Sequence, residues 1–409
     1  MILSKNSLKI LFLYSVAFVN LLFGRAGQGI EIFGYRIAEF FILLLFIFSV
    51  TSLLNLKRNT IQQKLFKSLF GLFIFLSLYY GISFPETFRY GSFVVSFYVF
   101  FLIKDTSPNE KQTLVFNIIV LSSIFLFIHY ILVGNFIFSN IFRNISDKPW
   151  DFLKASQIVV ILIYFIFFIF KTRINLPVKI FFSILSGLIG AFLVLSSRGA
   201  TLAFVLGLII LSINFKNKKH ILLLILTLIG STLFFIFTLD LTENIEESLS
   251  EYNISVNEEN TNLSNIYGTK YSCNNKLENF DFATNDANVN WRIHITKEVF
   301  KCSIENFYKF TFGYGFSELI IPMNNPMMQG SDGLNINPHN IILTVFYRMG
   351  FVGLVLFLTL YLKLIKGVKY SSVGICFITA SLFGVVFESV TQLVFWILVY
   401  LELNYYKSN

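Results

Sequence analysis

The sequence is poor in charged residues. Asp, Glu, Lys and Arg make up 13% of its 409 residues, whereas soluble domains carry about 25%. Hydrophobic residues reach 55%, including 51 Phe, and the mean hydropathy is +0.70. Apolar runs of about 18 to 25 residues recur along the chain. These properties exclude an ordinary soluble domain and predict an all-α, polytopic helical membrane protein.

Several signatures of chemistry are also missing. No GxxxxGK[ST] or GxGxxG motif occurs, so the sequence offers no nucleotide site. The 3 Cys and 4 His form no cluster with metal-ligand spacing. Segments that alternate polar and apolar residues, as a barrel requires, are absent. We therefore expect no cofactor and no metal. We also expect no nucleic-acid partner, because the basic residues behind the net charge of +9 fall mostly in short loops.

The apolar runs predict about twelve transmembrane spans. The first run follows Lys5 and Lys9 and has no convincing small-residue cleavage site after it, so we interpret it as a retained helix. We place the spans at residues 8–23, 31–54, 65–84, 88–103, 113–134, 155–170, 177–195, 199–214, 220–240, 339–362, 371–386 and 388–404.

Lysine and arginine are unevenly divided between successive loops. One alternate set of loops holds most of them, as at 57–67 and 363–369, and the other set holds few. The positive-inside rule then places both termini in the cytoplasm. It predicts a membrane domain at 1–240 with about nine spans, a large outer loop at 241–338, and a second membrane part at 339–409 with about three.

The second half of the outer loop has helical spacing. Trp291, Ile295, Val299 and Cys302 recur on one face and predict a short helix at 290–307, which Asn290 could cap. Such a helix could wall a site at the membrane edge or serve only as structure. A disulfide between Cys273 and Cys302 is chemically permitted in this segment.

A histidine and two arginines fall at the predicted outer membrane edge. His339 stands in Asn337-Pro338-His339-Asn340, where the loop meets an apolar helix. It could handle a proton, or merely snorkel while Asn337 caps the helix. Arg198 lies between two apolar runs, and Arg292 lies on the loop helix. Both could bind a phosphate, although Arg198 could instead anchor lipid headgroups.

Two further arginines are weaker candidates. Arg89 lies near an outer helix end, where a structural role is the alternative to substrate binding. Arg348 lies inside the helix that follows His339 and could face a polar cavity or snorkel.

At these residues the chain resembles the O-antigen ligase and O-antigen polymerase superfamily, whose members transfer lipid-linked glycans at the outer face of the bacterial cytoplasmic membrane. The resemblance covers roughly residues 190 to 360, and the earlier part matches in hydropathy only. Its motifs, in order, are Ser197-Arg198-Gly199-Ala200, then Trp291-Arg292 with Gly313-Tyr314-Gly315, then His339-Asn340 with Leu343, Gly350 and Gly353.

The resemblance implies a GT-C-like glycosyltransferase of the inner membrane that needs neither a nucleotide nor a metal. Its donor would be an undecaprenyl-diphosphate-linked oligosaccharide and its acceptor another glycan, with membrane lipids and a chain-length regulator as further partners. Arg198 and Arg292 would hold the diphosphate, and His339 would act as the general base. Asn340 would orient His339, contact substrate, or cap the helix.

Three functions follow as alternatives. A polymerase would join lipid-linked repeat units, and this is the function we expect. A ligase would perform the same chemistry with lipid A-core as the acceptor. A flippase or transporter would also fit many spans with few charges, but the chain lacks the two related halves typical of such carriers.

Overall fold

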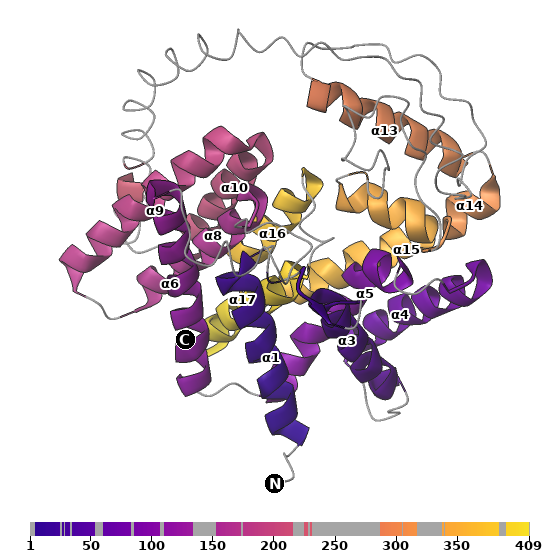
Figure 1. Cartoon of the computed structure of the whole chain (residues 1–409), viewed down its shortest axis with the longest axis horizontal. Helices are drawn as coiled ribbons and strands as arrows, with labels where there is room; N and C mark the ends of the chain where they lie inside the picture. Colours follow the sequence, from indigo (N-terminus) through magenta and orange to yellow (C-terminus); the bar gives the residue numbers. More distant parts are fainter. Residues whose placement is uncertain are drawn as a thin grey trace.

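The computed structural model describes residues 5–24, 27, 29–32, 35–53, 60–82, 86–106, 110–133, 153–172, 175–215, 225–227, 230, 287–304, 306–316, 338, 340–383 and 390–408. Nearly all of these residues lie in helices (Figure 1). The predicted all-α class is therefore confirmed. Most of the predicted span 220–240 and much of the loop 241–338 lie outside the described residues, as does His339.

The helices follow the predicted apolar runs closely. The N-terminal part contains α1 (Lys5–Leu22), α3 (Ile37–Leu53), α4 (Ile61–Tyr80), α5 (Glu86–Thr106), α6 (Glu110–Val133), α8 (Ala155–Lys171), α9 (Leu176–Ser196) and α10 (Arg198–Asn214). The C-terminal part contains α13 (Ala287–Ile304), α14 (Phe307–Phe312), α15 (Ile341–Ile365), α16 (Ser372–Leu382) and α17 (Thr391–Ser408).

The prediction was wrong at the start of the second span. Residues before α3 form a small antiparallel hairpin, in which β1 (Glu31–Ile32) pairs with β2 (Tyr35–Arg36). The helix begins only at Ile37, not at residue 31. A hydropathy window registers apolar content, and the β-branched Ile30 and Ile32 raise that content just as helical residues would.

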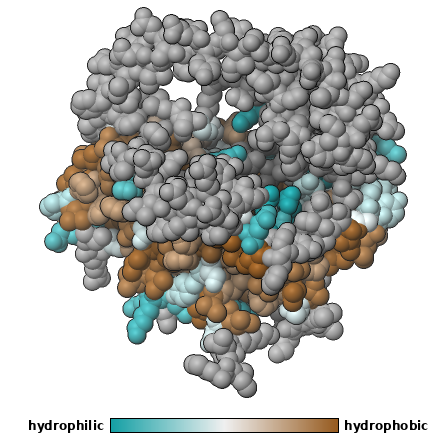
Figure 2. Space-filling model, in the orientation of Figure 1, coloured by the Kyte–Doolittle hydropathy of each residue, from teal (hydrophilic) through white to brown (hydrophobic). Residues whose placement is uncertain are grey.

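Membrane compatibility can be judged helix by helix. Within the described residues, three helices are long and apolar enough to cross a membrane: Ile61–Tyr80, Glu110–His129 and Ile341–Ile365. Several shorter apolar helices accompany them, including Ala155–Lys171 and Ser372–Leu382. Hydrophobic side chains also cover much of the outside of the described helices (Figure 2). The fold is thus compatible with a membrane protein, and the count of about twelve spans stays a prediction.

The core of the bundle is aromatic. Helix α5 packs against α3, α4 and α17. The ring of Phe97 on α5 lies 4.9 Å from the fully buried Trp396 on α17. Phe357 and Tyr361 of α15 surround the same place at centroid distances of 5.3 and 6.5 Å from Phe97. The abundance of Phe in the sequence therefore serves interhelical packing as well as lipid contact.

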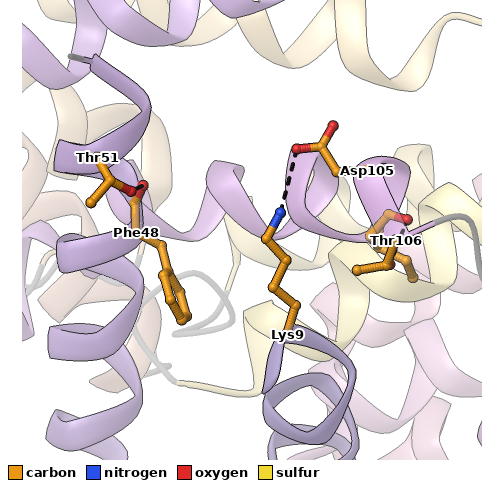
Figure 3. A network of polar contacts seen from close by, with 6 residues as sticks. Lys9, Phe48, Thr51, Asp105 and Thr106 are labelled. Atoms are coloured by element: carbon orange, nitrogen blue, oxygen red, sulfur yellow. Dashed lines mark hydrogen bonds and ion pairs between the residues drawn. The ribbon is translucent and has the colours of Figure 1, made fainter. Parts of the chain in front are cut away.

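The charge pattern predicts which helix ends lie on the same side of the membrane, and such ends are in contact in the structure. Lys9 near the start of α1 pairs with Asp105 near the end of α5, with 3.7 Å between Nζ and Oδ2 (Figure 3). Gln62 at the start of α4 donates to the carbonyl of Lys363 near the end of α15, at 2.8 Å. Asn214 at the end of α10 donates to the carbonyl of Tyr370 ahead of α16, at 2.7 Å.

The opposite ends meet in the same way. The hydroxyl of Tyr80 at the end of α4 donates to the carbonyl of Gly313 after α14, at 2.8 Å. Gln157 at the start of α8 donates to Thr391 at the start of α17, at 3.4 Å. The helices thus alternate in direction as expected. Which end faces the cytoplasm stays a prediction, and we name the second end, marked by Tyr80 and Gly313, the Tyr80 end.

Candidate functional site

The first element of the candidate site is the start of α10. Ser197 has extended backbone angles, and its hydroxyl accepts a hydrogen bond from the amide of Ala200 at 3.4 Å, so it is the N-cap. Arg198 is the first residue of the helix. A Cβ on Gly199 would lie 2.3 Å from Cβ of Phe383 at the end of α16, so only glycine permits this close approach. The small residues of this motif thus bring two helix ends together.

The position of Arg198 has an electrostatic consequence. A helix N-terminus carries a partial positive charge, and a cation in its first turn is unfavourable unless an anion is near. Exposed backbone N–H groups at such an end readily bind phosphate. The backbone of Arg198 therefore lies where an anionic ligand would relieve repulsion. The course of its side chain lies outside the described residues.

The second element is α13. Three of the four residues predicted on one face, Ile295, Val299 and Cys302, are each 2% exposed or less, and the side chain of Trp291 lies outside the described residues. Arg292 lies in the first half of the helix and is half-buried. The predicted cap at Asn290 was wrong, because the helix begins at Ala287, and the predicted segment 290–307 is divided into α13 and α14. Asn306 caps the second piece, and its side-chain oxygen accepts from the amide of Tyr308 at 2.8 Å.

The cysteines differ in state. Cys302 is disulfide-bonded, whereas Cys376 is a buried free thiol. Cys273, the remaining cysteine of the 3, lies outside the described residues. Cys376 is fully buried within α16, where it contributes to helix packing. Disulfides are typical of proteins in oxidising compartments.

The third element is a backbone joint between α14 and α15. Gly350 has φ 64 and ψ −168, which breaks the helical course of α15. In an unbroken helix the carbonyls of Tyr347 and Arg348 would accept from residues 351 and 352. Here they accept from the amides of Tyr314 and Gly315, at 2.8 and 3.0 Å. The loop after α14 is thereby hydrogen-bonded directly to the kinked helix.

Glycine is required on both sides of this joint. Gly313 has φ 76, and a Cβ there would lie 2.6 Å from the carbonyl carbon of Arg348. A Cβ on Gly350 would lie 2.3 Å from the carbonyl carbon of Thr311. Two backbones meet here without side chains between them. The Gly-Tyr-Gly motif and Gly350, noted separately in the sequence, are two halves of one contact.

Aromatic rings pack around the joint between α14 and α15. The ring of Tyr314 stacks on Tyr347 at 4.8 Å, and its hydroxyl donates to the carbonyl of Cys302 at 2.9 Å. Lys309 Nζ lies 4.5 Å from the ring centroid of Tyr80 and 4.2 Å from that of Tyr314. Burial, followed by a hydrogen bond with Tyr79, raises the pKa of Tyr308 above its usual value, so this phenol stays neutral.

The fourth element is the start of α15. Asn340 is the N-cap, and its side-chain oxygen accepts from the amides of Ile342 and Leu343 at 2.9 and 3.3 Å. The predicted cap at Asn337 was wrong, because the helix begins at Ile341. Of the roles considered for Asn340, capping is the one that the structure establishes. Capping occupies the amide oxygen and fixes the backbone directly beside His339.

Arg348 is held inside the bundle. It is 0% exposed, and Nη1 donates to the carbonyl of Gly315 at 3.3 Å. Its guanidinium carbon lies 4.4 Å from the ring centroid of Tyr90 and 5.4 Å from that of Tyr347. Snorkelling, one of the predicted alternatives, is excluded by this burial. Contact with a substrate stays a prediction that would require these interactions to open.

Arg89 forms an ion pair. Its Nη2 lies 2.6 Å from Oε1 of Glu39 on α3, with 35% of the Arg89 side chain exposed and 10% of the Glu39 side chain. The other carboxylate oxygen of Glu39 accepts from the backbone amide of Arg36 at 3.2 Å. The structural alternative predicted for Arg89 is thus realised, and substrate binding through its exposed part stays a prediction.

These elements share the Tyr80 end of the bundle. Helix α10 packs on α16, α16 packs on α15, and α13 and α14 pack on α15 (Figure 1). Arg198, Arg292 and Asn340 therefore belong to a connected set of helices. Sequence reasoning missed the tyrosines Tyr80, Tyr90 and Tyr347 in this region. No sequence signal distinguishes them from the rest of the 19 Tyr, since their contacts cross between distant helices.

The described helices form a bundle that is compatible with a membrane protein, and the candidate site lies where the chain enters α15. Residues 181–358 match the family described as O-Antigen ligase. A "Putative polysaccharide ligase" of Rickettsia felis is 35% identical over 109 residues, which cover 22% of this chain and 27% of that protein. No solved structure matches. The match agrees with the predicted resemblance to the O-antigen ligase and polymerase superfamily, and it is confined to residues 181–358.

Proposed function

We propose that the protein is a glycosyltransferase that moves a glycan from a polyprenyl diphosphate to a hydroxyl of an acceptor glycan. One observation carries the proposal. The family match at 181–358 contains the N-terminus of α10 with Arg198, the helix α13 with Arg292, and the capped start of α15 beside His339. Two cationic side chains, a helix N-terminus and a histidine suit a substrate with an anionic leaving group.

The reaction can be written with these residues. The acceptor oxygen attacks the anomeric carbon, and the bond from that carbon to the diphosphate oxygen breaks. Arg198 and Arg292 stabilise the negative charge that the departing diphosphate gains. His339 accepts the hydroxyl proton as the new bond forms. The products are the joined glycan and free polyprenyl diphosphate, and attack from the opposite face would invert the anomeric centre.

For the acceptor, we propose another lipid-linked repeat unit, which makes the protein a polymerase. The second candidate is a ligase with lipid A-core as the acceptor. The descriptions of the matched family and of the Rickettsia felis protein favour it, since both name ligases. The two candidates share the donor, the leaving group and the proposed residues, and differ only in the molecule that supplies the hydroxyl.

The proposed setting is the inner membrane. The charge alternation supports cytoplasmic termini, a periplasmic loop at 241–338, and membrane domains at 1–240 and 339–409. The chain-length regulator belongs to the polymerase proposal as a possible partner protein. Reporter fusions at the ends of α4 and α5 would test this orientation, since the proposal requires opposite sides for them.

Transfer by purified protein tests the reaction. Wild type in lipid should form a new glycosidic bond from a lipid-diphosphate donor, and His339→Ala should abolish it without loss of folded protein. Arg198→Lys should be strongly impaired, because an ammonium lacks the bidentate fork of guanidinium. Wild-type protein that forms no bond with either acceptor contradicts the proposal. Near-normal Arg198→Lys would instead support the lipid-anchor role for that residue.

A deletion strain separates the two acceptors. Loss of a polymerase leaves single repeat units on lipopolysaccharide, whereas loss of a ligase leaves none and lets lipid-linked polymer accumulate. A complete ladder of chain lengths in the deletion strain would contradict both.

A further inference from the structure

The loop helices α13 and α14 expose large apolar side chains. Phe300 and Ile304 are each 52% exposed, and Phe307 is 84% exposed. Phe300 and Ile304 are one helical turn apart and share a face, and Phe307 follows at the start of α14. We name these three residues the α13–α14 apolar face. In water, such a contiguous face would be a liability.

We propose that the α13–α14 apolar face is inserted among the acyl chains of the outer leaflet, so that the loop helices form an interfacial platform. The opposite face of α13 is already covered, since Ile295, Val299 and Cys302 are buried. Helix α13 is thus apolar on two sides. One side packs against the protein. On the other side the ring of Phe300 lies 6.2 Å from that of Phe346 of α15, and the exposed parts of Phe300, Ile304 and Phe307 are left for lipid to cover.

The neighbouring surface supports lipid as the occupant. Phe310 of α14 stacks on Phe351 of α15 at a centroid distance of 5.7 Å, and Phe351 is itself 50% exposed. Tyr308 of α14 lies 5.7 Å from Tyr79 of α4, which is 61% exposed. Both α4 and α15 are long and apolar enough to cross a membrane. Helix α14, which begins with Phe307, therefore lies against exposed aromatic side chains of two candidate spans.

The charges on α13 fit the same placement. Lys297 and Lys301 are exposed and lie one turn apart, beside the stripe of Phe300 and Ile304. Lysines at the edge of an apolar face can extend to headgroup phosphates while the face stays in lipid. Arg292, two turns before Phe300, would then be held near headgroup depth. This is the depth at which the diphosphate of a membrane-anchored donor lies.

Depth-dependent fluorescence quenching tests the platform in the full-length protein. The Phe307→Trp variant is reconstituted in phosphatidylcholine vesicles with or without acyl-chain bromination, and parent protein supplies the background of its 3 Trp. We expect bromination to remove most of the added emission. Lys297→Trp is the matched control on the same helix pair, and its added emission should be quenched less by bromolipid and more by aqueous iodide.

Two outcomes overturn the proposal. One is added emission at residue 307 that iodide quenches and bromolipid does not. The other is equal bromolipid quenching at residues 307 and 297, which would show no orientation of the face. Phe300→Trp repeats the measurement at a second position if Phe307→Trp fails to give folded protein on size-exclusion chromatography. None of these readouts depends on glycan transfer, so the platform and the proposed function can fail separately.

Discussion

The guanidinium of Arg348 lies 4.4 Å above the ring centroid of Tyr90, deep in a bundle that contains few charges. The same guanidinium donates to the carbonyl of Gly315. Arg348 thus connects α5, the loop after α14 and the kinked α15. Buried charges in membrane bundles are costly and are retained where they are needed. We infer that this one positions the joint beside the candidate site.

Arg348→Lys should destabilise the protein, since lysine lacks the planar group that stacks on tyrosine. A desolvated cation–π contact contributes about 2 kcal/mol, so a loss of about 1 to 2 kcal/mol is expected. Thermal unfolding in detergent measures it. Tyr90→Phe keeps an aromatic face and should lose less. If Arg348 instead binds substrate, the lysine variant would show a raised KM with unchanged thermal stability.

Gly350→Ala should be strongly destabilising. Its φ of 64 and ψ of −168 lie in a region that is essentially restricted to glycine and that costs an L-residue about 1 to 3 kcal/mol. The added Cβ would also lie 2.3 Å from Thr311 backbone atoms. Overpacking adds about 1 to 3 kcal/mol. The control is Gly71→Ala in α4, where nothing lies within 4 Å and alanine suits the helix. Equal unfolding temperatures for the two variants would contradict the backbone contact described here.

Arg89 and Glu39 should be energetically coupled. Because the Arg89 side chain is 35% exposed, solvent screens the pair and a coupling of about 1 kcal/mol is expected. Arg89→Gln, Glu39→Gln and the double variant form the cycle, measured by thermal unfolding. Transfer kinetics add a second readout. A raised donor KM in Arg89→Gln but not in Glu39→Gln would favour the predicted substrate role, and parallel effects would favour the structural one.

The state of Cys302 can be counted with a maleimide mass tag. Protein denatured without reductant should accept one tag, at Cys376, and reduced protein should accept three. Cys376→Ser is the control and should accept none before reduction. Three tags on protein that was purified and denatured without reductant would contradict the bond.

Much of the architecture was predictable, because an apolar run long enough for a membrane is a strong local signal. The buried residues of α13 were predictable from their three- to four-residue spacing. The uneven charge of the loops also predicted helix ends on the same side of the membrane, and such ends are in contact in the structure. Positions that depend on single hydrogen bonds were not predictable. Asn337 and Asn340 are equally good caps by residue type, and only the backbone angles select Asn340. The joint at Gly350 joins residues distant in sequence, so no local pattern reveals it.

Gln392 is a buried amide with only one end satisfied. Its Nε2 donates to Ser92 of α5 at 3.1 Å, while Oε1 has no hydrogen-bond partner in the described part of the chain. A buried unsatisfied oxygen costs about 1 to 3 kcal/mol. Gln392→Met keeps the length of the side chain and removes that oxygen, so unfolding in detergent should occur at a higher temperature.

Gln157 supplies the contrast, because both ends of its amide are used. Its Nε2 donates to Thr391 at 3.4 Å, and its Oε1 accepts from the amide of Lys154 at 3.0 Å. Gln157→Met should therefore lower the unfolding temperature, in the opposite direction to Gln392→Met. If both variants are destabilised alike, then Oε1 of Gln392 has a partner in the protein as it exists in solution. A water or a ligand hydroxyl has the donor group that such a partner requires.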